Sequence, residues 1–178
     1  RRAVLGLRPV ATSAGRYHRS GEASAWYASS SEQGAWAELF RHFTHDGVDP
    51  FEVLRRVARV RVVDLKVLDL TIGEAQRASA IADDLTWCQG AADRARSLGL
   101  DGIIAPSAAV HGATTLAMFD YSLHKVEVLN SRILPPPPRL VDVLGSIRLH
   151  HEVGPMTRAL LQRASVRGAD WVRRRRMG

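Results

Sequence analysis

The sequence predicts an α+β domain in which short strands and helices alternate unevenly along the chain. Hydrophobic residues make up 46% of its 178 residues, enough to bury a core. Short apolar runs bounded by Gly or Pro, such as residues 102–105, are typical of buried strands. A longer segment, from residue 31 to about 43, has apolar residues at helical spacing. No apolar run approaches the ~18 residues of a membrane span, and no secretory signal opens the chain.

The first part of the chain predicts a loop, a strand and a helix, in that order. Residues 1–21 are rich in Gly, Ser and Arg and are expected to form a loop, and residues 25–28 are a strand candidate. Ser29 and Glu32 have the spacing of a capping box, so a helix should follow to about Phe43. The apolar face of this helix would consist of Ala35, Trp36, Leu39, Phe40 and Phe43.

The middle of the chain adds strands and a second helix. A turn is expected at residues 47–50, a strand at 59–65 and a further short strand at 67–70. Residues 87–98 form a plausible helix, and Gly99 would close it.

The last strands precede a change in composition. Strands are expected at residues 102–105, 116–119 and 126–129. Residues 135–138 are four prolines and form a stiff spacer, beyond which residues 140–171 are amphipathic and expected to be helical. The chain is therefore divided into a domain at 1–139 and a basic C-terminal extension at 140–178.

Charge and cysteine content restrict the possible partners. The net charge of +7 favours anionic partners such as a nucleic acid, a dinucleotide, phosphate or an acidic protein. Residues 173–176 are four consecutive arginines, for which a solvated tail is the more usual explanation than a nucleic-acid site. The single cysteine, Cys88, allows no intramolecular disulfide, which fits a reducing cytoplasm.

General catalytic motifs are absent from the sequence. It has no glycine-rich phosphate loop and no nucleophile elbow, and its seven histidines lack ligand spacing, so we expect no metal. Taken singly, the polar candidates have ordinary explanations. Arg16 would be a loop arginine, Tyr27 a core residue, Glu38 a solvated helix carboxylate and Ser107 a turn residue.

Order and spacing give these residues a different meaning. The runs at 15–18 (Gly-Arg-Tyr-His), 26–29 (Trp-Tyr-Ala-Ser) and 35–38 (Ala-Trp-Ala-Glu) resemble the opening of a RES domain, a family named for an Arg, a Glu and a Ser. The family's glutamate stands eleven residues after its tyrosine, and Tyr27 and Glu38 keep this interval.

The remaining motifs follow in the same order. Arg16 matches the family's arginine, and Tyr17 stands where a tryptophan is more usual. Ser107 follows an apolar strand and Pro106, as the family's serine does. A further early arginine of the family could correspond to Arg1, Arg2 or Arg8, or be missing from this sequence. The resemblance extends over roughly residues 15–130.

The resemblance implies a fold, a substrate and a reaction. RES domains resemble ADP-ribosyltransferases of the diphtheria-toxin type, with a split small β-sheet core and surrounding helices. Members are NAD⁺-consuming toxins that cleave the nicotinamide–ribose bond by phosphorolysis or hydrolysis. NAD⁺ would be the substrate and phosphate a possible co-substrate, with no bound cofactor. Transfer of ADP-ribose to a protein is the alternative reaction, and the sequence leaves the acceptor open.

The resemblance also implies roles for the matched residues. Arg16 offers a planar fork of donors to a pyrophosphate or an incoming phosphate. Tyr27, and with it Tyr17, would lie against the cationic nicotinamide ring. Glu38 would offset the positive charge that develops on the ribose, and Ser107 would position Glu38 or bind phosphate.

Partners and rival functions complete the hypothesis. A bacterial, cytoplasmic toxin of this family is neutralised by an antitoxin with an Xre-type DNA-binding domain, so a homo- or hetero-oligomer without membrane contact is expected. The first rival is a nucleic-acid-binding module, supported by the net charge and the arginines at 173–176. The second is an inactive interaction module that has kept the fold.

Overall fold

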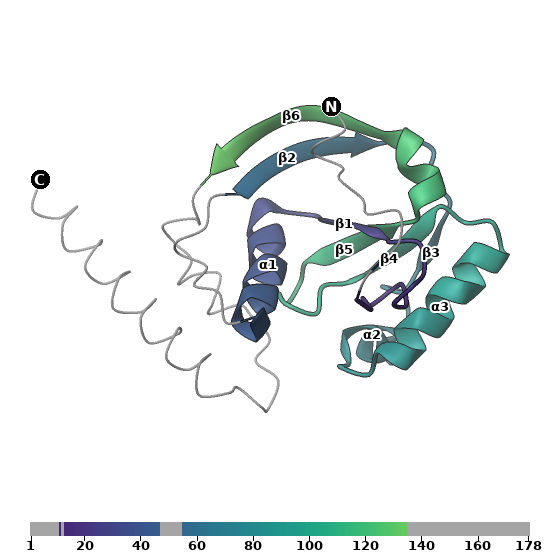
Figure 1. Cartoon of the computed structure of the whole chain (residues 1–178). Coiled ribbons are helices and arrows are strands. Elements are labelled where there is room, and N and C mark those ends of the chain that lie inside the picture. The colour runs from purple at the N-terminus through teal and green to yellow at the C-terminus, as the bar shows by residue number, and fades with distance from the viewer. Residues whose placement is uncertain (1–10, 12, 47–54, 135–178) are drawn as a thin grey trace, which may run out of the picture.

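A four-stranded sheet forms the centre of the protein, in a computed structural model that describes residues 11, 13–46 and 55–134 (Figure 1). The strands lie in the order β1-β5-β4-β3, with β4 parallel to β3 and antiparallel to β5, which is itself antiparallel to β1. Their bounds are β1 Trp26–Ser29, β3 Val67–Asp69, β4 Gly102–Pro106 and β5 Thr114–Met118. As its apolar run predicts, β4 is largely buried.

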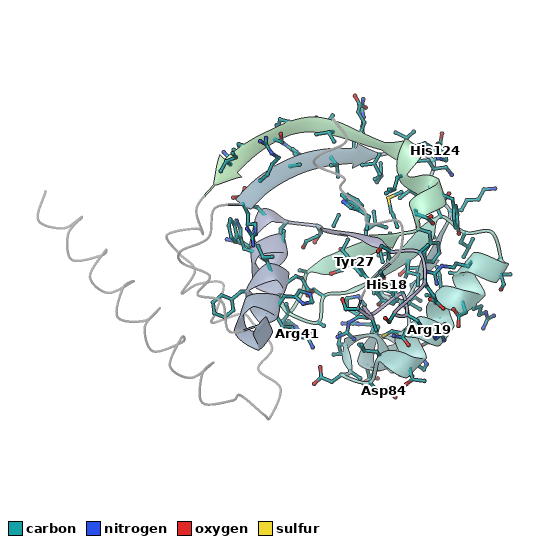
Figure 2. The ribbon with its side chains drawn as sticks, in the orientation of Figure 1. His18, Arg19, Tyr27, Arg41, Asp84 and His124 are labelled. Carbon is teal, nitrogen blue, oxygen red and sulfur yellow. The ribbon has the colours of Figure 1, made fainter. Side chains whose placement is uncertain are left out.

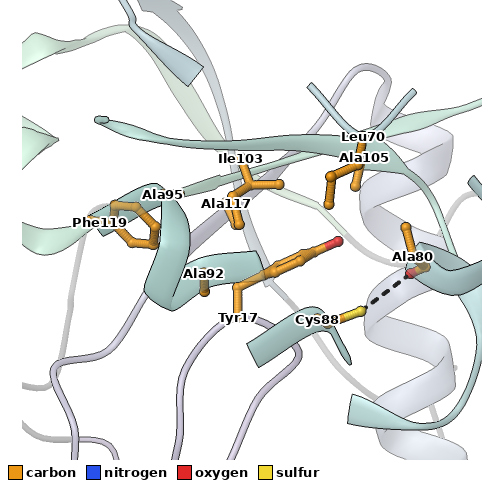
Figure 3. Packing of buried hydrophobic residues seen from close by; sticks show 10 residues of the cluster. All are labelled: Tyr17, Leu70, Ala80, Cys88, Ala92, Ala95, Ile103, Ala105, Ala117 and Phe119. Carbon is orange, nitrogen blue, oxygen red and sulfur yellow. Dashed lines mark hydrogen bonds between the residues drawn. The ribbon is translucent and has the colours of Figure 1, made fainter. Parts of the chain in front are cut away.

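Helices α2 (Glu74–Ile81) and α3 (Leu85–Ser97) cover one face of this sheet, and α1 (Glu32–Asp46) packs beside β1 at the end of the sheet (Figure 1). Cross-strand partners share a face, so Ile103 on β4 and Ala117 on β5 point the same way. These two side chains meet small helix residues in the core shown in Figure 3. The buried cluster contains Tyr17, Leu70, Ala80, Cys88, Ala92, Ala95, Ile103, Ala105, Ala117 and Phe119.

A two-stranded ribbon arches over the other face of the sheet (Figure 1). It consists of β2 (Arg55–Val62) and β6 (Val126–Leu134), which pair antiparallel with a register shift between Arg59 and Val60. The short 3₁₀ helix η3 (Asp120–Lys125) connects β5 to β6. The β strands are therefore split into two small sheets, and the sequence-based α+β class is confirmed.

A buried carboxylate joins the two sheets. Asp101 is 7% exposed and accepts hydrogen bonds from Lys125 Nζ at 2.7 Å, the Lys66 backbone N–H at 2.7 Å and Ser122 Oγ at 2.8 Å. Burial alone would raise the pKa of Asp101, but these three donors outweigh it and lower the pKa to about 2. The start of β4, the end of η3 and the loop before β3 are thus held at one point.

The helix ends show why these segments stop where they do. The hydroxyl of Ser31 accepts a hydrogen bond from the Gly34 N–H at 3.0 Å, so Ser31 caps α1. The expected capping box at Ser29 is therefore wrong, because Ser29 belongs to β1. Gly99 follows α3 with φ +65°, and its N–H and that of the next residue bond back to the last turn, so its predicted role is confirmed.

Other elements differ from the sequence-based expectations in extent. The structure confirms strands near 25–28, 67–70, 102–105, 116–119 and 126–129 and a helix near 87–98, although β6 is longer and α3 begins earlier. The strand expected at 59–65 lies at 55–62. Helices α2 and η3 were not predicted. The expectations for 47–50, 135–138 and 140–171 lie outside the described residues. No helix in the described part of the chain is long and apolar enough to cross a membrane.

Candidate active site

A carboxylate and a hydroxyl meet where α1 crosses the ends of β4 and β5. Ser107 Oγ lies 2.7 Å from Glu38 Oε1, and the backbone N–H groups of Ala109 and Val110 each donate to Ser107 Oγ at 3.1 Å. A hydroxyl has one proton and two acceptor lone pairs. Because the two N–H groups use the acceptor capacity, the proton of Ser107 points to Glu38, which must accept it.

The surroundings of Glu38 keep its charge available. Thr115 Oγ1 is 3.5 Å from the same carboxylate oxygen, a distance at the limit of a hydrogen bond. Ser107 is fully buried and Glu38 is half-buried. Among the described residues, no lysine or arginine forms an ion pair with Glu38. The carboxylate is therefore held by hydroxyl groups rather than neutralised by a cation.

Tyr27 lies on the same face of the sheet as Glu38. Its cross-strand partner on β5 is Ala117, two residues from Thr115, so Tyr27 and Thr115 point to one side. The residue is 38% exposed, but its hydroxyl is held inside by the Tyr17 N–H at 3.0 Å and by His18 Nδ1 at 3.1 Å (Figure 2). Burial raises the pKa of Tyr27 to about 12, so the ring stays neutral.

His18 organises this tyrosine. Burial is the largest influence on the imidazole and lowers its pKa, although a hydrogen bond to the backbone of Ser13 opposes the shift. A neutral ring that donates to Ser13 leaves Nδ1 as the acceptor for the Tyr27 hydroxyl. The Gly15 backbone lies against the His18 ring so closely that a Cβ atom there would clash. A side chain at position 15 would therefore push the His18 ring away from Tyr27.

Tyr17 and Arg16 lie deeper than the sequence suggests. The Tyr17 ring is 1% exposed and stacks with Tyr27 at a centroid distance of 6.3 Å, so it lies behind Tyr27 in the core instead of on an open surface. Arg16 Nη1 donates to the carbonyl oxygens of Ala80 at 3.1 Å and Ala82 at 2.6 Å. Arg16 thus stabilises the carbonyl end of α2. Its predicted contact with phosphate stays a prediction.

Two α3 residues hold the loop that carries these side chains. Gln89 Nε2 donates to the carbonyl oxygens of Gly15 at 3.2 Å and His18 at 3.4 Å. Arg96 Nη2 donates to the Tyr17 carbonyl at 3.0 Å. Sequence reasoning did not assign roles to His18, Gln89 or Thr115. The Gly-Arg-Tyr-His run gave a signal for His18, because it placed this residue beside matched residues, and the pair Cys88-Gln89 also resembles family positions.

The structure therefore brings Glu38 and Ser107 into direct contact. Tyr27 and Thr115 lie on the same face of the sheet as this pair. Tyr17 packs beneath the Tyr27 ring, and Arg16 binds the end of α2. Within residues 13–46 and 55–134, no group of three or more His, Cys, Asp and Glu side chains could hold a metal ion. The site combines an anchored carboxylate with a partly exposed aromatic ring. Such a pair can bind a cationic aromatic group and stabilise a positive charge next to it.

Fold and site together define a small α+β protein with a Ser–Glu pair at the sheet edge. The model of the RES domain family matches residues 2–141, and the chain belongs to this family. A curated relative from Mycobacterium tuberculosis, named a probable NAD(+) phosphorylase, is 48% identical over 168 residues, which cover 91% of this chain and 81% of the relative. A solved structure of the M. tuberculosis MbcT–MbcA toxin–antitoxin complex is similar in fold, with a TM-score of 0.60, 22% identity and coverage of 74% and 77% of the two chains.

Proposed function

We propose that this chain consumes NAD⁺ by cleaving the bond between nicotinamide and ribose. The observation that carries the proposal is the Glu38 carboxylate, which Ser107 holds at 2.7 Å and no cation neutralises among the described residues. Cleavage of this bond leaves positive charge on the ribose carbon as neutral nicotinamide departs. A fixed carboxylate beside that carbon stabilises the transition state more than the ground state. The name of the curated relative supports the same substrate.

Each step of the reaction has a candidate residue. The exposed part of the Tyr27 ring is the platform for the cationic nicotinamide ring, with its orientation set by Tyr17 and His18. The C–N bond breaks with both electrons going to the ring nitrogen, so no general acid is needed. Glu38 hydrogen-bonds the ribose hydroxyls and offsets the charge on carbon.

Inorganic phosphate is the acceptor we propose first, because the relative is named a phosphorylase. A phosphate oxygen forms the new bond to the ribose carbon, giving ADP-ribose 1″-phosphate and nicotinamide. Water would give ADP-ribose, with Glu38 taking the proton. A protein acceptor would give an ADP-ribosylated protein. Arg16 remains the candidate for a phosphate contact, through guanidinium donors other than Nη1.

Product analysis separates these reactions. Purified full-length chain is incubated with NAD⁺ in phosphate-free buffer and in buffer with inorganic phosphate, and the products are identified by mass spectrometry. We expect nicotinamide and ADP-ribose 1″-phosphate only when phosphate is present. Appearance of ADP-ribose in both buffers would make the enzyme a glycohydrolase. Intact NAD⁺ in both buffers, with candidate protein acceptors also present, would contradict the proposal.

We also propose a protein partner and a finer fold class. The solved relative is part of a toxin–antitoxin complex, which supports an antitoxin as the partner of this chain. An Xre-type DNA-binding domain in that antitoxin and an ADP-ribosyltransferase-like arrangement of the two sheets follow from the family resemblance. Co-expression with the neighbouring open reading frame, followed by size-exclusion chromatography, tests the partner. A chain that purifies alone and does not harm its host when expressed alone would contradict it.

A further inference from the structure

We propose that the cleft between the two sheets, which borders the Glu38 site at Tyr27, binds an extended acidic segment of a partner protein. The cleft has a volume of about 900 Å³ and lies between β1 with the first turns of α1 and the β2–β6 ribbon. Glu38 and Ser107 do not line it. Tyr27, the proposed nicotinamide platform, does line it, so the cleft adjoins the candidate active site, but the proposal does not require NAD⁺ cleavage.

The ribbon gives the cleft a positive wall. Arg132 Nη2 donates to Glu32 Oε2 on α1 at 3.1 Å, which shows that the Arg132 face of the ribbon points inward. Val57 pairs with Arg132 and therefore shares this face. Arg55 and Arg59, two residues to either side of Val57 on the same strand, also line the cleft. Among the described residues, four arginines line the cleft, against Glu32 as the single carboxylate.

One of these arginines has no ion-pair partner among the described residues. Arg132 is paired with Glu32, but Arg59 is exposed and forms no ion pair with any described residue. Arginine binds carboxylates through a planar fork of donors. The sequence from residue 135 onward is itself rich in arginine, so charge complementarity favours an acidic segment of another protein over this part of the chain.

The opposite wall of the cleft is the edge strand β1, whose outer backbone groups are available for pairing. All four residues of β1 line the cleft, and β1 is the edge strand of its sheet among the described residues. The Ser30 N–H bonds to the Thr114 carbonyl, so by antiparallel alternation the backbone groups of Tyr27 and Ser29 point away from β5. An extended peptide can pair with such an edge.

Two polar groups in the cleft wall also lack partners among the described residues. Trp36 is 3% exposed and lines the cleft, yet its Nε1–H has no hydrogen-bond acceptor in the described part of the chain. The hydroxyl of Ser29, which also lines the cleft, is buried and has no partner there either. An unpaired buried donor destabilises the empty cleft, and a bound acceptor would remove this cost. Trp26 and Trp36 add apolar surface for alternate side chains of the peptide.

Selection from a random peptide library tests the proposal. Full-length chain is immobilised and used to select from a displayed library of random dodecapeptides, and the best binder is synthesised for anisotropy measurements. We expect selected sequences to alternate Asp or Glu with apolar residues. The substitution Arg59→Glu should lower the affinity for the peptide on the order of tenfold or more, because an attractive charge pair becomes a repulsive one. Backbone N-methylation at alternate peptide residues should abolish binding, because it removes strand pairing.

Controls make each result decisive. Arg94→Glu makes the same charge change at an exposed position on α3, which covers the other face of the sheet, and should leave peptide affinity unchanged. If Arg59→Glu does not fold, Arg59→Gln serves with a smaller expected loss. Selected peptides without acidic residues, equal losses in the Arg94 and Arg59 variants, or unchanged binding after N-methylation would overturn the proposal. Displacement of the peptide by a single-stranded oligonucleotide would also overturn it, because the cleft would then be a nucleic-acid site.

Discussion

At the scale of single residues, Glu38 differs from an ordinary surface carboxylate through its partners. We expect Glu38→Gln to fold normally, because the amide oxygen can still accept from Ser107. The substitution removes the negative charge, so the rate of NAD⁺ cleavage should fall about 10²–10³-fold while NAD⁺ affinity changes much less. Melting temperature, affinity and turnover are the measurements. Glu74→Gln, an exposed change on α2, is the matched control. Equal turnover in the Glu38 and Glu74 variants would show that Glu38 is a solvated carboxylate without a catalytic role.

Tyr27 has separable ring and hydroxyl functions. Tyr27→Ala removes the aromatic platform, so we expect NAD⁺ affinity to fall. Tyr27→Phe keeps the ring but leaves the Tyr17 N–H and His18 Nδ1 without their partner, so it should destabilise the loop by about 1 kcal/mol with a smaller loss of affinity. Thermal unfolding and calorimetric titration with NAD⁺ separate the two effects. If both variants lose affinity equally, the ring is not the platform.

The spacing of family motifs allowed the candidate site residues to be selected from the sequence. It did not show which of their side chains are buried. Arg16, Tyr27, Glu38 and Ser107 were selected by order and spacing, and the contact between Ser107 and Glu38 agrees with one of the two roles expected for the serine. The sequence could not show that the Tyr17 ring faces the core, because an aromatic in a glycine-rich loop has no periodicity that reveals its orientation.

At the scale of secondary-structure elements, the Asp101 cluster makes stability depend on pH. The pKa of Asp101 is about 2 in the folded chain and about 3.9 in an unfolded one. The carboxylate therefore contributes stability that is fully present above about pH 4 and is lost as pH falls through about 2. Asp101→Asn should lower the free energy of unfolding at pH 7 by about 1–3 kcal/mol.

Denaturant unfolding at several pH values tests this expectation. The difference between the parent and Asp101→Asn should be constant from neutral pH to about pH 4 and should shrink below it. Asp120→Asn, an exposed change on η3, should show no such pH-dependent difference. A deficit in Asp101→Asn that is unchanged down to about pH 2 would mean that the carboxylate charge is not what stabilises the junction.

Helices and strands with a clear apolar pattern were predictable from the sequence. Elements that form because of their tertiary contacts were not. The β4 run and the α3 pattern with its Gly99 end were recognised because burial and capping leave clear sequence signals. Helix α2 has only Ala80 buried among polar residues, so it lacks an apolar face. The cap of α1 fell at Ser31 because three consecutive serines offer alternative caps.

At the scale of the whole molecule, every proposed site residue precedes residue 138. The family model also ends at residue 141. We therefore expect a chain truncated after Pro138 to keep NAD⁺ cleavage, with changes mainly in solubility or assembly. Turnover and light-scattering mass of the two proteins are compared. A truncated chain that folds and assembles like the parent but does not cleave NAD⁺ would place part of the site in the extension.

The α+β class was predictable from composition and alternating periodicities, but the split into two sheets depends on contacts between distant segments. The β2–β6 pairing joins residues such as Arg61 and Glu127, far apart in sequence, and single-strand patterns carry no information on such partners.

The central claim is that Ser107 acts through Glu38, and a double-mutant cycle on NAD⁺ cleavage tests it most directly. Turnover is measured for the parent, Glu38→Gln, Ser107→Ala and the double variant, with folding verified by melting temperature. If the two residues act as a unit, the double variant should be no slower than Glu38→Gln alone. Losses that multiply in the double variant would show that Ser107 acts independently of Glu38, for example by binding phosphate itself, and would contradict the account.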